Sequence, residues 1–371
     1  MAGRFYVATR KGLFTITSGM QGRWNIENVS FAADNVGLVM FDPRDGMLYV
    51  SLEHSHFGTK VHRSLDGGNT WQEIATPSYP PKPEGEVDLD PWRQTPREWK
   101  LEKIWAFAPG HSSQPSTIWC GTLPGGLFRS DDSGASWQLV ESLWNHPLRK
   151  SWSGGGMDQP GIHSICLNPA NELELAVAVS CGGVWKTNDA GASWYCDGTG
   201  MYAEYMPPDK REDPVAQDPH LMVRCAAQPD HLWVQHHNGI FYSQDNARTW
   251  EVQGLDKVPS TFGFAVAVHP TDPGTAWFVP GIKDEKRIPV DAKLAVTRTR
   301  DGGKSFDTLT SGLPQEHAYD VVYRHALAID AAGQELMFGS TTGNVWASNN
   351  QGNDWQPVCS PLPPVYAVVA G

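Results

Sequence analysis

An eight-residue stretch that closes on an aromatic residue recurs along the chain. It reads SLDGGNTW at 64–71 and returns as SDDSGASW at 130–137, TNDAGASW at 187–194, SQDNARTW at 243–250, TRDGGKSF at 299–306 and SNNQGNDW at 348–355. The closing aromatic residues lie 66, 57, 56, 56 and 49 positions apart, which is the spacing of a repeated supersecondary unit. A degenerate copy ends at Trp24, 47 positions before Trp71. The chain therefore contains seven units.

Each repeat of this stretch, called a box below, has the composition of a tight turn between two strands. A glycine-led segment of alternating apolar and polar residues precedes it, as in GGLFRS at 125–130 and NGIFYS at 238–243. In such a turn the Asp accepts hydrogen bonds from backbone N–H groups, the Gly takes a positive φ, and the Ser or Thr ties the turn together. The aromatic ring buries a large apolar surface. We expect it to anchor each turn to its own sheet.

A second repeat precedes each hairpin and predicts the inner strands. It occurs at 37–43, 103–109, 163–169, 223–229, 264–270, 325–331 and 365–371. Its fourth residue is mostly small, as expected where sheets converge on an axis. The N-terminal segment lacks such a strand, and the C-terminal segment ends with one. We therefore predict one domain, residues 1–371, that is an all-β, seven-bladed β-propeller of four-stranded blades. The C-terminal strand completes the N-terminal blade and closes the ring, which removes exposed strand edges.

The pattern S/T-x-D-x-G-x-S/T-W resembles the Asp-box, or bacterial neuraminidase repeat, of sialidases, sortilin-type receptors and several glycoside hydrolases. The resemblance implies that the boxes lie on the outside of the propeller, away from the active face. It supports two classes of function. One is a glycoside hydrolase that acts on or binds a saccharide. The other is a non-catalytic ligand-binding, protein-binding or assembly propeller, similar to sortilin-type receptors or photosystem II assembly factors.

Composition narrows the range of partners. The net charge of −12 argues against a nucleic-acid partner, which needs a basic surface, and it disfavours an anionic membrane. No apolar run of about 20 residues is present, and the opening residues do not resemble a secretory signal. The six Cys show no CxxC spacing and fall mostly in strand patterns, so we predict buried thiols and a cytoplasmic location. We assign no cofactor.

The candidate functional face is the mouth of the channel opposite the boxes. Loops that enter inner strands and turns between second and third strands share that face, and such non-repeating loops usually carry function in a propeller. Polar residues gather in these segments. We predict that a carbohydrate or other small polar ligand is bound by His54, His56, His163, His220, His236, His237, His317, Tyr319, Arg324 and His325.

Three interpretations of the histidines remain open. They can satisfy buried polar groups where strands crowd together, or they can bind a sugar. They can also bind a metal ion, since imidazole is a common ligand. Only His54-Ser55-His56 has a suggestive spacing for the third interpretation, so we assign no residue to a metal.

A glycosidase needs two carboxyl groups about 5 Å apart for retention, or about 6.5 to 9.5 Å apart for inversion. We favour Asp320, which lies between Tyr319 and Arg324 in a loop that enters an inner strand. Asp218 and Glu285 are the candidate partners, with Asp284 and Glu53 as further options. One carboxyl group would act as acid and the other as base or nucleophile.

Three long inserts, 77–103, 143–161 and 197–220, enter the same face. We expect them to wall a pocket, although they could instead cap the channel or form an oligomer contact. The aromatic residues that we expect to stack on sugar rings are Trp92, Trp99, Trp152, Tyr202 and Tyr205.

Overall fold

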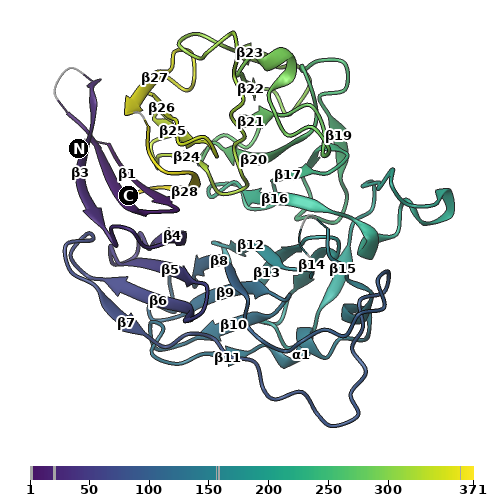
Figure 1. Ribbon diagram of the computed structural model, residues 1–371. Coiled ribbons are helices and arrows are strands. Elements are labelled where there is room, and N and C mark those ends of the chain that lie inside the picture. The colour runs from purple at the N-terminus through teal and green to yellow at the C-terminus, as the bar shows by residue number, and fades with distance from the viewer. Residues whose placement is uncertain (1–2, 20–21, 156, 158, 360) are drawn as a thin grey trace.

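Seven antiparallel sheets of four strands form a closed ring (Figure 1). The computed structural model describes residues 3–19, 22–155, 157, 159–359 and 361–371. The predicted seven-bladed β-propeller is confirmed, because each of the seven sheets contains four antiparallel strands.

Six blades are formed by strands that follow one another along the chain. The first of them consists of β4 (Val36–Phe41), β5 (Leu48–His54), β6 (Gly58–Ser64) and β7 (Gln72–Ile74). The second consists of β8 (Lys103–Pro109), β9 (Ile118–Leu123), β10 (Leu127–Ser130) and β11 (Gln138–Leu139). The third consists of β12 (Ile162–Asn168), β13 (Asn171–Val179), β14 (Gly183–Thr187) and β15 (Tyr195–Asp197). The fourth consists of β16 (Pro219–Arg224), β17 (Leu232–His236), β18 (Gly239–Ser243) and β19 (Glu251–Gln253). The fifth consists of β20 (Gly263–Val268), β21 (Ala276–Pro280), β22 (Val296–Thr299) and β23 (Asp307–Leu309). The sixth consists of β24 (Leu327–Ile329), β25 (Leu336–Gly339), β26 (Val345–Ser348) and β27 (Gln356–Cys359). Short helices lie in or beside the inserts, at α1 (Glu141–Trp144) and in 3₁₀ turns at Pro147–Ser151, Pro208–Lys210 and Pro214–Ala216. A further 3₁₀ turn, Val290–Ala292, lies between β21 and β22.

The remaining blade joins the two ends of the chain. Its strands are β28 (Val365–Ala370), β1 (Arg4–Thr9), β2 (Gly12–Ser18) and β3 (Trp24–Ser30). The inner strand β28 pairs antiparallel with β1, with Val7 opposite Val368, and the two termini lie beside each other in Figure 1. The predicted ring closure by the C-terminal strand is therefore confirmed.

One inner strand begins earlier than its repeat indicates. The motif at 223–229 predicts the strand, but β16 covers Pro219–Arg224, and the following residues bend out of the sheet. His220 therefore lies within the strand, and Asp218 directly precedes it. This shift brings both side chains to the channel.

The boxes form the turns between the third and fourth strands, with the hydrogen bonds that their composition predicts. Asp66 Oδ1 accepts the backbone N–H of Thr70 at 2.9 Å and the Ser64 hydroxyl at 2.7 Å. Gly68, at φ +93°, donates its N–H to Ser64 Oγ at 2.9 Å. The same bonds recur around Asp132, Asp189, Asp245 and Asp301. In the last box Asn350 takes this place and accepts the N–H four residues on at 3.0 Å.

The box tryptophans contact the neighbouring blade as well as their own sheet. The Trp71 ring lies 4.8 Å from that of Phe31, which follows β3 of the closing blade. Trp137 donates its Nε1–H to the carbonyl oxygen of Ala75 in the preceding blade at 2.9 Å. The expectation that each ring anchors only its own sheet is therefore incomplete. The rings also join one blade to the next.

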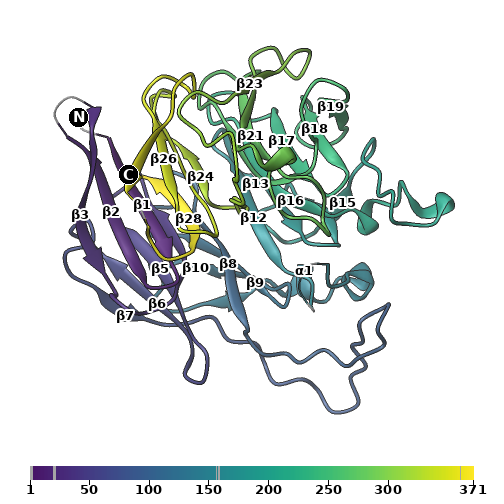
Figure 2. The same ribbon diagram turned by 45° about the horizontal axis from the view of Figure 1, so that its top comes forward.

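A buried carboxylate fastens two of the long inserts together. Asp88 in the insert 77–103 accepts a hydrogen bond from Arg149 of the insert 143–161 at 2.8 Å. Arg97 lies 3.6 Å from the other oxygen of Asp88, and Trp99 donates to Asp88 at 3.0 Å. In Figure 2 the insert 77–103 projects from the ring near β9 and α1. The two inserts are thus joined by the ion pairs and hydrogen bonds of Asp88 and not by a shared sheet.

Five cysteines are free thiols. Cys120, Cys166 and Cys225 are buried, as predicted, whereas Cys181 and Cys196 are half-buried. The side chain of Cys359 lies outside the described part. Among the described residues, no helix has the length and apolar character needed to cross a membrane.

Candidate functional site

A cavity of about 1020 Å³ lies at the channel mouth opposite the boxes, and segments of all seven blades contribute to its lining. The positions come from the starts of inner strands and from turns between second and third strands, as the topology predicts. Aromatic side chains supply much of its wall, at Trp105, Tyr202, Tyr205, Phe262, Phe264, Tyr323 and Tyr366. The cavity therefore combines apolar rings with charged groups, which is typical of small-molecule sites.

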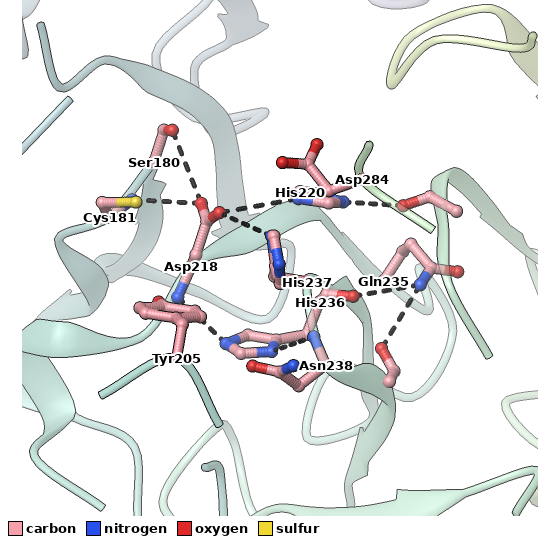
Figure 3. Close-up of polar contacts among 12 residues, drawn as sticks. Ser180, Cys181, Tyr205, Asp218, His220, Gln235, His236, His237, Asn238 and Asp284 are labelled. Carbon is pink, nitrogen blue, oxygen red and sulfur yellow. Dashed lines mark hydrogen bonds and ion pairs between the residues drawn. The ribbon is translucent and has the colours of Figure 1, made fainter. Parts of the chain in front are cut away.

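Asp218, His220 and His237 come together on one wall of this cavity (Figure 3). Asp218 Oδ2 lies 3.6 Å from Nε2 of His220 and 3.4 Å from Nδ1 of His237. Pro219 is paired with His236 across β16 and β17, so the two strands hold the three residues next to each other. Asp218 and His220 are almost fully buried, and His237 is partly exposed to the cavity.

The surroundings of His220 determine which of its nitrogens faces Asp218 with a lone pair. Its Nδ1 lies 2.6 Å from the carbonyl oxygen of Gly263 and donates to it. The ring also stacks on Phe264 at 4.7 Å. Burial lowers the pKa of His220, against the opposing effect of Asp218. In this neutral form, Nε2 carries no proton.

Asp218 is held as a carboxylate. Its Oδ1 accepts the backbone N–H of Cys181 at 3.1 Å and lies 3.5 Å from the Ser180 hydroxyl. Burial alone would raise the pKa of Asp218, but the contacts of His220 and His237 and the charge of Arg324 hold it well below its usual value. For His237, burial acts to lower the pKa, but the neighbouring Asp218 carboxylate raises it overall.

Two guanidinium groups gather beside this cluster. Arg324 lies 4.9 Å from the ring of Trp105 and 5.5 Å from that of Phe264. Arg287 lies 5.3 Å from the same Phe264 ring and forms an ion pair with Asp284. Nε of Arg324 is buried without a hydrogen-bond partner among the described residues. This wall is therefore suited to an anionic group of a ligand.

The structure brings some predicted site residues to the cavity and keeps others away. Those that line it are Asp218, Glu285, His220, His237, Arg324 and His325. His163 and His236 are buried behind the wall, where His163 offers its carbonyl oxygen to His325 at 2.8 Å and His236 accepts the N–H of Asp218 at 2.9 Å. The predicted residues outside the lining are His54, His56, His317, Tyr319 and Asp320.

Asp320 is held by the turn between β25 and β26. Its carboxylate accepts hydrogen bonds from Ser340 at 2.7 Å, from Asn344 at 2.9 Å and from Thr342. The side chain is buried and lies outside the cavity lining. Asp320 and Asp218 are therefore not brought together around one cavity. Glu285 lines the cavity but is exposed and forms an ion pair with Lys283 at 3.0 Å.

The inserts form part of the cavity wall, as we expected from their length. Tyr202 and Tyr205 line the cavity. Trp92 lines a second cavity of about 740 Å³, which shares Cys181 and Tyr205 with the first. Trp152 is buried, and Trp99 binds Asp88.

The sequence interpretation did not single out the Asp218, His220 and His237 cluster, nor the rings of Phe262, Phe264 and Tyr323. A signal for the cluster exists. Residues two apart on a strand face the same side, so Asp218-x-His220 directs both side chains one way. The rings have no comparable signal, because their meeting depends on the curvature of the ring of blades.

Comparisons with known proteins support the fold alone. No protein-family model and no curated protein matches the chain, so the Asp-box resemblance remains a resemblance of motif. Among solved structures, an ancestral GH74 enzyme is similar with a TM-score of 0.56 and 16% identity, covering 91% of this chain. This chain spans only 38% of that enzyme's length.

Two further structures match more of their own length. A Bacteroides uniformis protein assigned provisionally as a 6-phosphogluconolactonase has a TM-score of 0.58 and 10% identity, and the match covers 100% of this chain and 99% of that one. YCF48 bound to a D1 peptide has a TM-score of 0.51 and 14% identity, with 87% and 80% covered. Enzymes and binding proteins therefore share this architecture.

Proposed function

We propose that this protein is a hydrolase that binds a saccharide, preferably one that carries a carboxylate or phosphate, at the channel mouth. One observation carries the proposal: a cavity of about 1020 Å³ in which aromatic rings, a buried carboxylate and two arginines converge. The rings offer stacking surfaces for sugar rings. Arg324 and Arg287 favour an acidic substituent, and Asp218 is the carboxylate best placed for chemistry.

Binding is tested by calorimetric titration with neutral sugars, uronic acids and sugar phosphates. Because a charge-assisted hydrogen bond contributes about 1.5–3 kcal/mol, Arg324→Gln should weaken binding of an acidic sugar at least about tenfold. The control is Arg300→Gln in the fifth box, an exposed position on the opposite face. Equal affinity in the wild type and in Arg324→Gln would remove Arg324 from the proposal.

Hydrolysis is tested on a panel of aryl glycosides and pooled oligosaccharides. Asp218→Asn should abolish release. Asp320 stays a predicted catalytic residue, although its hydrogen bonds support a role in holding its loop. If Asp320→Asn loses release at an unchanged Tm, the catalytic role gains support. A lower Tm with release retained would assign Asp320 to the loop.

A non-catalytic binding propeller is the second candidate function, and a specific observation favours it. The Lys283 hydrogen bond lowers the pKa of Glu285, and the pKa of Asp218 is also below its usual value. Neither group is held protonated, as a general acid would be. If the wild type binds sugars but releases none from any substrate, this second function replaces the first.

A further inference from the structure

We propose that Asp218, His220 and His237 bind one divalent transition-metal ion, of the zinc class, with further coordination positions open to the cavity. One ligand atom from each residue lies within 4.8 Å of the other two. This proposal is about metal binding alone, and it does not depend on whether the protein binds a saccharide. An ion there would supply an activated water for the proposed hydrolysis.

The separations of the ligand atoms fit a metal ion better than direct hydrogen bonds. Asp218 Oδ2 lies 3.4 Å from Nδ1 of His237 and 3.6 Å from Nε2 of His220. A charge-assisted N–H···O bond is about 2.7–2.9 Å long. Two ligands that each lie about 2.0–2.1 Å from a tetrahedral ion are separated by about 3.3 Å. The two separations from Asp218 are close to that value, and the two histidine nitrogens lie within 4.8 Å of each other.

The orientation of His220 provides an independent argument. Its Nδ1 donates to the carbonyl oxygen of Gly263 at 2.6 Å, so Nε2 is the nitrogen left for an ion, and it faces the Asp218 oxygen at 3.6 Å. Metal-bound histidines almost always donate their other N–H to a carbonyl or carboxylate in this way.

The second oxygen of Asp218 completes this arrangement. Oδ1 accepts the backbone N–H of Cys181 at 3.1 Å and lies 3.5 Å from the Ser180 hydroxyl, which leaves Oδ2 for the ion (Figure 3). Such outer contacts orient a ligand and raise metal affinity. The backbone also contributes, because all three ligands lie on or beside the paired strands β16 and β17.

The ligand types indicate which ions fit. Imidazole nitrogens suit zinc, iron, cobalt and nickel, whereas calcium and magnesium prefer shells of oxygen ligands. Three protein ligands with an open position are typical of catalytic zinc sites. His237 lines the cavity, so exchangeable positions would face the bound ligand.

The test is metal binding by the full chain, without any sugar. Protein stripped with a chelator and dialysed is titrated with Zn²⁺ by calorimetry and with Co²⁺ by visible absorption, and bound metal is counted by mass spectrometry. We expect one equivalent per chain. His237→Gln should weaken Zn²⁺ binding at least about 100-fold, because it removes one of three ligands. Asp218→Asn should do the same.

His325→Gln is the matched control, since His325 lines the same cavity outside the cluster; it should bind Zn²⁺ as the wild type does. His237 lies in a partly exposed turn, so its variant remains informative if Asp218→Asn fails to fold. Failure of the wild type to bind one equivalent, or equal affinity in His237→Gln, would overturn the metal site. Sugar binding without metal binding would refute only this inference, and metal binding without sugar binding or release would refute only the proposed function.

Discussion

The two faces of the ring use the same residue type in opposite ways. On the box face, Asp66 is exposed and receives its hydrogen bonds from Ser64 and Thr70, at most four positions away. On the cavity face, Asp218 is buried, and its partners include His237 and Cys181, which come from different blades. A carboxylate that receives all its hydrogen bonds from its own turn stabilises the fold. One whose partners gather from distant segments around a cavity is a candidate for chemistry.

The largest expected effect on stability sharpens this contrast, because the buried carboxylate of Asp88 joins two inserts on the cavity face. Asp88→Asn leaves Arg149 buried beside a neutral group, whereas Arg97 keeps Asp90 at 3.8 Å. Removing one partner of a buried ion pair costs about 3–5 kcal/mol, so we expect a loss of about 3 kcal/mol in the free energy of unfolding, measured in urea.

The matched control for Asp88→Asn is Glu86→Gln. Glu86 forms an ion pair with Lys150 in the same two inserts, but that pair is more exposed. Exposed pairs contribute about 0–1 kcal/mol, so this variant should remain near the wild type. Equal losses in both variants would show that the wall does not depend on Asp88.

The second prediction concerns the stability of the protein at acidic pH, and it involves the aspartates of the box face. Hydrogen bonds from the Thr70 and Ser193 side chains, aided by backbone N–H groups, lower the pKa values of Asp66 and Asp189 to about 2. A carboxylate with a depressed pKa in the folded state stabilises the protein above its unfolded pKa of about 3.9. That contribution is lost as the pH falls through about 2. The Tm should therefore drop between about pH 4 and pH 2.

The double variant Asp66→Asn with Asp189→Asn tests the source of this acid sensitivity. The last box carries Asn350 at the same position, so the substitution copies a turn that the chain already forms. We expect a flatter Tm-versus-pH curve below about pH 4. An unchanged slope would assign the acid sensitivity to other carboxylates.

We expect the smallest loss of stability from Gly68→Ala in the first box. Gly68 has φ +93°, and Ala247 occupies the same place in the fourth box at φ +59°. A Cβ at Gly68 would meet Trp71 at 3.5 Å and Leu48 at 3.6 Å, which are ordinary contacts. The cost should thus be conformational, about 1 kcal/mol. A loss of several kcal/mol in a urea titration would show that the boxes are less tolerant than their repetition suggests.

The difference between the faces also explains what could be predicted. The hydrogen bonds of a box join residues within four positions, so the composition of the box predicts them. Asp320 was favoured because Tyr319 and Arg324 flank it, but its side chain bonds to Ser340, Thr342 and Asn344. Those partners lie 20 to 24 positions away, beyond the reach of a local pattern.

The repeated hairpins, the strand that closes the ring and the face on which we expect function can all be predicted from the sequence. These follow from local turn chemistry and from the order of the strands. Which side chains meet on that face depends on the tertiary structure. Asp218, His220 and His237 come together through the pairing of β16 with β17, and Arg324 reaches them across the channel mouth from the segment before β24. Such contacts depend on the spacing and curvature of whole blades, which no short stretch of residues specifies.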